Sequence, residues 1–386
     1  MRIALLCMSV EPGRDGVGDY VLQLARAAST RGHTCQIVAL ADRFIEQPSV
    51  GLDPQDGFEI VRIPVAQWAR TEINLAVERL AQFRPDWVSL QMVCYGFEKR
   101  GLLWRSVARF ARLRAAPNRH LMFHELWIGA GRKSPPKDRA IGWIQRRLLQ
   151  RTTRMWSPKV IHTSNAVYRE MLHRAKINAQ ELPLPGNIPV LEVDPVVARA
   201  RILQQLNPAL PPGQSLLAAV FGSIHPQWRD PTWMDQVASL CTQQNRRLVI
   251  VQFGRAGMSG LEVLHSLRSH TAGRVDFLEL GERPAEEISA LLQGVDFGVA
   301  TTPWPLIGKS GTAAAMLEHG LPVLVTREDA VLRGRTLATS TSASHPRLFR
   351  LKPFCEALEQ NRLPRSRPQV RSDIYDAFIG ALEFAS

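Results

Sequence analysis

Residues 301–324, TTPWPLIGKSGTAAAMLEHGLPVL, decide the fold class of this chain. The apolar run at 295–300 before them predicts a buried strand, and a second apolar strand is predicted from Pro322. A glycine-rich turn and a small-residue helix that begins near Lys309 connect the two strands. A strand, a helix and a second strand in this order are typical of a parallel sheet with crossover helices.

The first turn of this helix, residues 309–312 (KSGT), combines groups that bind phosphate. Backbone N–H groups, an ammonium group and two hydroxyls lie there at the positive end of a helix dipole. An ordinary turn with a Ser or Thr N-cap is the alternative interpretation. The GKS triplet at 308–310 matches the end of a Walker P-loop, but that motif needs a glycine where this chain has Pro303. A P-loop is therefore excluded, and the phosphate site and the plain capped turn both remain.

Length and composition predict a two-domain globular protein. The chain has 386 residues, more than one core usually supports, and its 45% apolar and 22% charged content is ordinary. Five scattered cysteines without CxxC spacing favour buried free thiols in a reducing cytosol over disulfides or zinc. The apolar N-terminus is too short for a signal peptide and no run of 18 apolar residues exists, so we expect a cytoplasmic protein without a membrane span.

The net charge of +13 is concentrated between residues 99 and 174. Two helices expected there, at 101–115 and 138–156, interleave arginines with apolar residues. Such helices can bury one face and solvate the other, or bind anionic lipid headgroups at about 1 kcal/mol per basic residue. We expect Arg105, Arg109, Arg146 and Arg147 to contribute to binding of an anionic membrane surface. Nucleic acid is an unlikely partner because no nucleic-acid-binding motif accompanies the charge.

Apolar runs and helical patterns alternate along most of the chain. Strands are expected at 3–8, 35–40, 59–63, 87–92, 121–123 and 159–163, and in a second series at 216–221, 248–253, 275–280, 295–300 and 322–325. Helices are expected at 19–30, 72–82, 102–115, 139–155, 166–175, 233–243, 261–270, 285–292 and 310–318. This alternation predicts doubly wound parallel sheets.

Prolines at 183, 185, 189 and 195 predict a linker around residues 183–196. We therefore expect a first domain at 1–190 and a second at 191–370, with a last helix at 371–386 that packs back on the first domain. The first loop, EPGRDGVGDY (11–20), allows close approach of a ligand to its glycines. It is not spaced GxGxxG, since Val21 stands where the third glycine belongs, and a nicotinamide site is disfavoured.

Six segments resemble, in order and spacing, glycosyltransferases of family 4 (group 1), which have the GT-B fold. They are GVGDYVLQLARAASTRGHTCQIVAL (16–40), FHELW (123–127), IHTSNAVYREML (161–172), FGSIHPQWRD (221–230), FLELGERPAEEISALLQGVDFGVAT (277–301) and HGLPVLVT (319–326). The resemblance implies two Rossmann-like, doubly wound parallel-sheet domains facing a central cleft. The N-terminal domain would bind the acceptor and the C-terminal domain the nucleotide-sugar donor.

By this resemblance the protein moves a sugar from a UDP- or GDP-linked donor to a glycan or lipid-linked acceptor, with retention of configuration, in cell-envelope polysaccharide or glycoconjugate synthesis. We expect no cofactor besides the donor itself and no metal ion, because no Asp-x-Asp signature lies in a suitable loop. The protein would work in the cytoplasm, peripherally on the inner face of the membrane. A non-catalytic sugar-nucleotide-binding protein and a GT-B sugar-nucleotide epimerase are the alternatives.

The resemblance also implies site residues. The candidates for catalysis are His124, which would contact the transferred sugar, and Glu125. The candidates for the donor phosphates are Gly16, Val17, Gly18, Ser223, Arg229, Gly308, Lys309, Ser310, Gly311 and Thr312. Those for the ribose and base are Gly254, Glu282 and Glu318. Cations and helix-terminal amides fit the reaction because cleaving a sugar–phosphate bond develops negative charge on the leaving diphosphate.

The chain departs from the family at two places. The usual pair of glutamates, eight residues apart, is missing, since Ile307 and Ala315 stand at those positions. Ser223 stands at the position of the usual phosphate-binding arginine, which leaves Arg229 and His225 as nearby candidates. We expect Lys309 to supply the missing charge.

Overall fold

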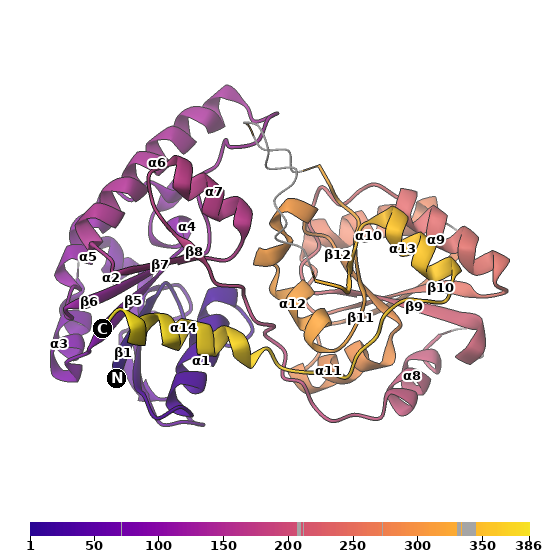
Figure 1. The fold of residues 1–386 in the computed structure, drawn as a ribbon, viewed down its shortest axis with the longest axis horizontal. Coiled ribbons are helices and arrows are strands. Elements are labelled where there is room, and N and C mark those ends of the chain that lie inside the picture. The colour runs from indigo at the N-terminus through magenta and orange to yellow at the C-terminus, as the bar shows by residue number, and fades with distance from the viewer. Residues whose placement is uncertain (71, 207–209, 211, 272, 330–332, 334–344) are drawn as a thin grey trace. The chain divides into compact units, whose positions relative to one another are not determined.

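A computed structural model of the chain describes every residue except 71, 207–209, 211, 272, 330–332 and 334–344. Contacts divide the described residues into two compact units (Figure 1). The first contains Met1–Leu184, Arg333 and Ser372–Ser386, and the second contains residues 185–329 and 345–371.

The first unit is built on a sheet with the strand order β3-β4-β2-β1-β5-β6-β7-β8. Its strands are β1 (Arg2–Cys7), β2 (Thr34–Asp42), β3 (Ser49–Leu52), β4 (Glu59–Pro64), β5 (Trp87–Met92), β6 (Asn118–Phe123), β7 (Val160–Thr163) and β8 (Gln180–Glu181). All neighbouring pairs are parallel except the edge pair β3 and β4. The central strands are buried on both faces, which explains their largely apolar sequences.

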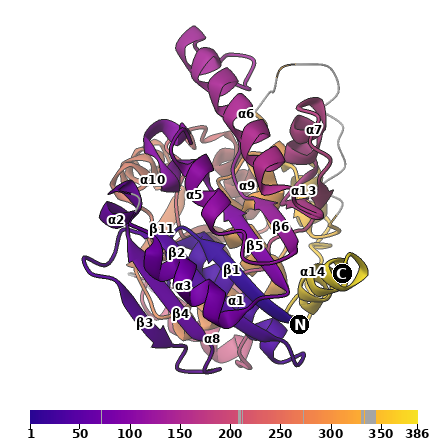
Figure 2. The ribbon, with the colours of Figure 1, turned by 90° about the vertical axis from the view of Figure 1, so that its left-hand side faces the viewer.

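Helices cover both faces of this sheet. They are α1 (Gly16–Ser29), α2 (Val65–Arg70), α3 (Asn74–Phe83), α4 (Cys94–Phe97), α5 (Ser106–Arg112), α6 (Pro136–Trp156), α7 (Ala166–Arg174) and α14 (Ser372–Phe384), with a 3-10 turn, η1, at Lys99–Gly101. The last helix, α14, lies beside α1, where Phe378 and Leu382 share an apolar core with Val21 and Leu24 (Figure 1). Helices α3 and α5 lie on the opposite face (Figure 2).

The second unit has a wholly parallel sheet with the order β11-β10-β9-β12-β13-β14. Its strands are β9 (Ser215–Phe221), β10 (Arg247–Phe253), β11 (Val275–Gly281), β12 (Phe297–Ala300), β13 (Val323–Val325) and β14 (Leu348–Phe349). Its helices are α8 (Pro195–Leu203), η2 (Pro212–Gln214), α9 (Thr232–Gln243), α10 (Met258–His270), α11 (Ala285–Gly294), η3 (Trp304–Lys309), α12 (Gly311–Glu318) and α13 (Leu351–Glu359). One core lies under α9, α10 and α13 and the other under α8, α11 and α12. The sheet is therefore doubly wound.

The α/β class with two parallel-sheet domains is confirmed, and the differences from the sequence prediction are local. Strand β3 was not expected, because all of its residues are exposed and no apolar pattern marks it. Helix α5 begins at Ser106 rather than near 101, because the Glu98 carboxylate accepts hydrogen bonds from the N–H groups of Arg105 (2.9 Å) and Ser106 (2.6 Å). Helix α8, also unexpected, begins at Pro195, with Asp194 as its N-cap. None of the helices in the described part of the chain has the length and apolar character needed to span a bilayer.

Candidate active site

Glycines end three neighbouring strands of the second unit. Gly222 follows β9, Gly254 follows β10 and Gly281 ends β11, and all three have positive φ angles, +73°, +79° and +68°. The N–H of Gly222 donates to the Phe253 carbonyl (2.9 Å), and the N–H of Gly254 donates to the Gly281 carbonyl (2.7 Å). Other residues adopt this conformation only at a cost. The carboxyl edge of the sheet, where parallel sheets bind ligands, therefore carries a row of bare backbone. Only Gly254 of this row was singled out from the sequence.

The start of α12 lies against this glycine row. Ser310 is the N-cap of the helix, and its hydroxyl accepts from the Ala313 N–H (3.2 Å) and lies 3.0 Å from the Thr312 hydroxyl. A Cβ atom on Gly222 would lie 2.8 Å from the Thr312 Cγ2. Lys309 ends the short helix η3 just before the cap. The structure thus brings residues 309–312 together with the glycine row at the positive end of α12.

Two further basic side chains lie near this helix start. Burial lowers the pKa of His225, and the charges of Arg327 and Lys309 lower it further against the opposing effect of Asp329. Arg327 is only 7% exposed and donates to the carboxylate of Asp329 (2.7 and 2.9 Å) and to the side chain of Gln227 (3.0 Å). Arg327 was not predicted from the sequence as a site residue. The sequence feature that could have indicated Arg327 is its position two residues after β13, at the edge of the sheet where ligands bind.

The loop after β9 holds the other two predicted phosphate ligands. Ser223 is exposed, and its carbonyl accepts from the Thr301 hydroxyl at 3.3 Å. Arg229 is also exposed, and its Nε donates to the Pro226 carbonyl (3.0 Å) within the same loop. Both residues therefore lie on the loop that follows the glycine row, and their contact with a phosphate stays a prediction.

The two acidic candidates for the ribose differ in position. Glu282 follows β11 directly, is exposed, and pairs with Arg255 (3.0 Å) after the neighbouring strand. Glu318 ends α12, about 10 Å along the axis from the start of the helix. Its buried carboxylate accepts from the N–H of Gly186 (2.9 Å). The structure therefore places Glu282 beside the glycine row, whereas Glu318 holds the backbone at the start of the second unit.

In the first unit, an aspartate caps the start of α1. The buried carboxylate of Asp15 accepts from the N–H groups of Val17 (3.0 Å) and Gly18 (2.9 Å) and from the Ser9 hydroxyl (2.6 Å). The N–H groups of Val17 and Gly18 are thus hydrogen-bonded within the chain, and contact of Gly16, Val17 or Gly18 with a donor phosphate stays a prediction. Gly18 is required for packing, since a Cβ there would lie 2.6 Å from the Ser9 carbonyl, whereas a Cβ on Gly16 would contact nothing within 4 Å.

His124 and Glu125 follow β6, at the carboxyl edge of the first sheet. His124 is 6% exposed, its Nε2 lies 2.8 Å from the Gln91 Oε1, and its ring packs edge-on against Tyr20. Burial lowers the pKa of His124 to about 3, so the imidazole is neutral near pH 7. Glu125 is half-buried near Cys94, where burial, and then the charge of Glu125, raise the pKa of the thiol to about 12.

The basic helices α5 and α6 pack against each other. The arginines in and beside these helices differ in their exposure to solvent. Arg109 is only 3% exposed, and its guanidinium lies over the Trp68 ring and donates to the Ala69 carbonyl, which removes it from the expected membrane surface. Arg146 is half-buried. Arg105 and Arg147 are exposed as expected.

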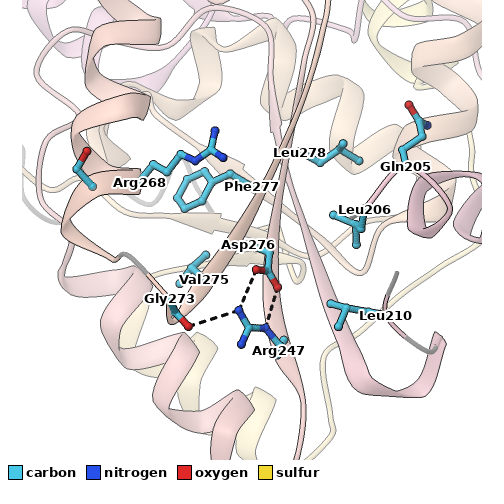
Figure 3. A pocket seen from close by; sticks show the side chains of 11 residues that line it. Gln205, Leu206, Leu210, Arg247, Arg268, Gly273, Val275, Asp276, Phe277 and Leu278 are labelled. Atoms are coloured by element: carbon cyan, nitrogen blue, oxygen red, sulfur yellow. Dashed lines mark hydrogen bonds and ion pairs between the residues drawn. The ribbon is translucent and has the colours of Figure 1, made fainter. Parts of the chain in front are cut away.

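A cavity of about 780 Å³ lies elsewhere in the second unit (Figure 3). It is lined at the amino ends of β10 and β11 by Arg247, which donates twice to Asp276 (2.7 and 2.8 Å), and by Phe277. This is the edge of the sheet opposite to the glycine row, so the cavity is not the candidate active site. Among the residues that the structure describes, no group of three or more His, Cys, Asp and Glu side chains is placed to hold a metal ion. Metal independence of the reaction stays a prediction.

Comparison with known proteins gives a family for part of the chain and a fold for all of it. The family model of the glycosyl transferase 4-like domain matches residues 15–182. No curated protein sequence matches the chain.

Solved structures match over the whole length. HepE from Anabaena, in complex with UDP and glucose, has a TM-score of 0.54 at 15% identity. The match covers 100% of this chain and 95% of the HepE chain. The catalytic domain of starch synthase IV from Arabidopsis thaliana, bound to ADP and acarbose, has a TM-score of 0.55 at 11% identity, with coverage of 100% of this chain and 99% of that one. A UDP-forming trehalose-phosphate synthase from Burkholderia xenovorans has a TM-score of 0.52 at 11% identity, with 99% and 98% covered. At such identities the likeness shows the fold alone, and that fold is GT-B.

Proposed function

Since residues 15–182 are a glycosyl transferase 4-like domain in a chain that has the GT-B fold throughout, we propose that the protein transfers a sugar from a nucleoside-diphosphate sugar to a glycan or lipid-linked acceptor. The observation that carries the proposal is the glycine row at 222, 254 and 281 beside the start of α12. A diphosphate can approach this backbone closely because the glycines themselves carry no side chain. HepE and the starch synthase were solved with nucleoside diphosphates, UDP and ADP, which agrees with this assignment.

The residues at the start of α12 supply what the leaving group needs. As the sugar–phosphate bond breaks, negative charge accumulates on the diphosphate, and fixed N–H groups and cations stabilise it. The positive end of α12, the Lys309 ammonium and the loop residue Arg229 take this role in the proposal. Arg327 adds a cation to the same edge, and His225, with its lowered pKa, adds an imidazole, where the family's usual arginine is replaced by Ser223.

His124 is proposed to contact the transferred sugar as a neutral imidazole. Its lowered pKa keeps it uncharged, so it exchanges a hydrogen bond with a sugar hydroxyl instead of competing with the cations for the phosphates. Glu125 is proposed to position the acceptor hydroxyl. Retention of configuration and independence of a metal ion complete the proposal.

The test is a donor panel. UDP- and GDP-sugars are incubated with the protein, with and without glycan and polyprenyl-diphosphate-sugar acceptors, in the presence and absence of EDTA. We expect nucleoside diphosphate release that depends on an acceptor and is insensitive to EDTA. Binding of nucleotide without release would instead identify a non-catalytic binding protein, and an epimerised free donor would identify an epimerase.

We further propose that the acceptor is reached at an anionic membrane surface, from the cytoplasmic side. The exposed face of α6 carries basic residues at 147, 151 and 154 and Trp143, which recur every three or four positions. Trp143 is 59% exposed under the Arg147 guanidinium, and Trp104, before α5, is 60% exposed. Basic side chains around exposed tryptophans are typical of a helix that lies in a membrane interface.

Vesicle sedimentation tests the proposed binding to an anionic membrane surface. Wild-type protein should bind phosphatidylglycerol-containing vesicles at low salt and dissociate as ionic strength rises. Reversal of Arg147, Arg151 and Arg154 to Glu should weaken binding at least a hundredfold, at about 1 kcal/mol or more per residue. The matched control reverses three exposed arginines of the second unit, Arg201, Arg362 and Arg367. Equal loss in both variants would mean that only net charge matters, and no binding by the wild type would refute the membrane proposal.

A further inference from the structure

Five buried polar side chains form one hydrogen-bonded chain that starts at His124. From His124 it passes to Gln91 and Ser89 on β5, then to His120 on β6 and His162 on β7. None of the five is more than 6% exposed. The order β5-β6-β7 and the pairing of Ser89 with His120 in the sheet register bring these residues into line.

The hydrogen bonds have a direction. The Gln91 amide nitrogen donates to the Ser89 hydroxyl oxygen (2.7 Å), and the Gln91 carbonyl oxygen therefore faces the His124 Nε2 (2.8 Å). Since an amide oxygen only accepts, that nitrogen of His124 carries the proton.

The remaining links continue in the same direction. The Ser89 hydroxyl donates to the His120 Nδ1 (2.7 Å). His120 then carries its own proton on Nε2 and donates it to the His162 Nδ1 (3.0 Å). Each of the four links then joins one donor to one acceptor, without a charged histidine. Burial lowers the pKa of all three histidines, which supports neutrality.

We propose that Gln91 is a positioning residue that fixes His124 in the Nε2–H tautomer, and that Ser89, His120 and His162 hold the Gln91 amide in the required orientation. The His124 Nδ1 makes no hydrogen bond to any residue that the structure describes. It is left as an acceptor for an O–H donor. The assignment of that donor to a hydroxyl of the transferred sugar rests on the proposed function, whereas the tautomer does not.

Histidine nitrogen NMR on the full chain tests the tautomer directly. Protein labelled with 15N-histidine gives two-bond 1H–15N correlations that distinguish protonated from bare ring nitrogens, and a His124→Gln variant assigns the signals. We expect His124 to show a protonated Nε2 and a bare Nδ1 at pH 7. A protonated Nδ1 in the wild type would overturn the proposal.

Substitutions of Gln91 and Ser89 test which residue fixes the tautomer of His124. Gln91→Leu should populate both tautomers of His124, and Ser89→Ala should do the same by freeing the Gln91 amide to rotate. Gln91→Glu can still accept from His124, so it should keep the Nε2–H form, which covers the case that Gln91→Leu does not fold. An unchanged tautomer in both Gln91→Leu and Ser89→Ala would refute the positioning role.

The matched control is Gln36→Leu. Gln36 is equally buried on β2 of the same sheet, but its amide donates to Glu59 (2.7 Å) rather than toward His124. Its loss should leave the His124 nitrogen signals unchanged. If the protein also transfers sugar, Gln91→Leu should lower kcat at least about tenfold with little change in the donor KM, because a histidine in the wrong tautomer loses its role. Absence of any transfer would refute the proposed function and leave the NMR test of the tautomer decisive.

Discussion

Substitution of Gly222 by alanine tests the packing of α12 against the glycine row. Gly222 has a φ of +73°, and a new Cβ would lie 2.8 Å from the Thr312 Cγ2. Rotation of the Thr312 side chain away from this contact would separate its hydroxyl from that of Ser310, now 3.0 Å away. The methyl group introduced at position 222 would therefore press against the Thr312 side chain, which its hydrogen bond with Ser310 holds in place.

The expected loss of stability has two parts. A left-handed alanine costs about 1–2 kcal/mol, of which about 0.4–1 kcal/mol is offset because alanine also restricts the unfolded chain. Overpacking against Thr312 adds about 1–3 kcal/mol. Gly222→Ala should thus reduce the free energy of unfolding by about 2–4 kcal/mol. Gly281→Ala, with a φ of +68° and no atom within 4 Å of its new Cβ, should lose only about 1 kcal/mol.

Urea unfolding of four proteins measures the free-energy contribution of the contact between the Cβ at position 222 and the Thr312 Cγ2. They are the wild type, Gly222→Ala, Thr312→Ser and the double variant, in which serine keeps the hydroxyl but lacks the Cγ2 methyl. The double variant should recover at least about 1 kcal/mol relative to the sum of the single losses, since neighbouring residues do not behave additively. Additivity within about 0.3 kcal/mol, or equal losses for Gly222→Ala and Gly281→Ala, would show that α12 does not lie where the structure places it.

Three further predictions concern the proposed site and its supporting core. Lys309→Ala should weaken UDP or GDP binding by about 1–3 kcal/mol in calorimetry, the cost of a lost charged hydrogen bond, whereas the exposed Lys352→Ala should not; equal affinities would remove Lys309 from the donor site. His124→Ala should lower kcat far more than donor affinity, and near wild-type turnover would leave His124 a structural residue. Burial lowers the pKa of His120, of His124 to about 3 and of His162 to about 4, whereas unfolded histidine binds a proton near pH 6.5. The resulting stability is complete above about pH 6.5 and is lost as pH falls, by up to about 1.4 kcal/mol per pH unit for each histidine; equal urea midpoints at pH 7.5 and 5.5 would contradict it.

Local sequence patterns determined most of the strands of both sheets. Buried parallel strands need continuous apolar runs, and those at 216–221 and 248–253 coincide with β9 and β10. The helix start near Lys309 was also predictable, because Ser310 has the chemistry of an N-cap whatever the helix packs against. Strand β3 and helix α8 were not predictable, because neither shows an apolar period of its own.

Only the tertiary structure decided which distant residues meet. The strand order β11-β10-β9-β12 places the ends of three strands side by side, so glycines 222, 254 and 281 form one row although many residues separate them in sequence. The same holds for Gln91 and His124, which belong to neighbouring strands. The hydrogen-bond partners of a loop are also a tertiary property, as at the start of α1, where the Asp15 carboxylate accepts from the N–H groups of Val17 and Gly18. Strand order and hydrogen-bond partners depend on how the whole chain packs, and no window of sequence contains that information.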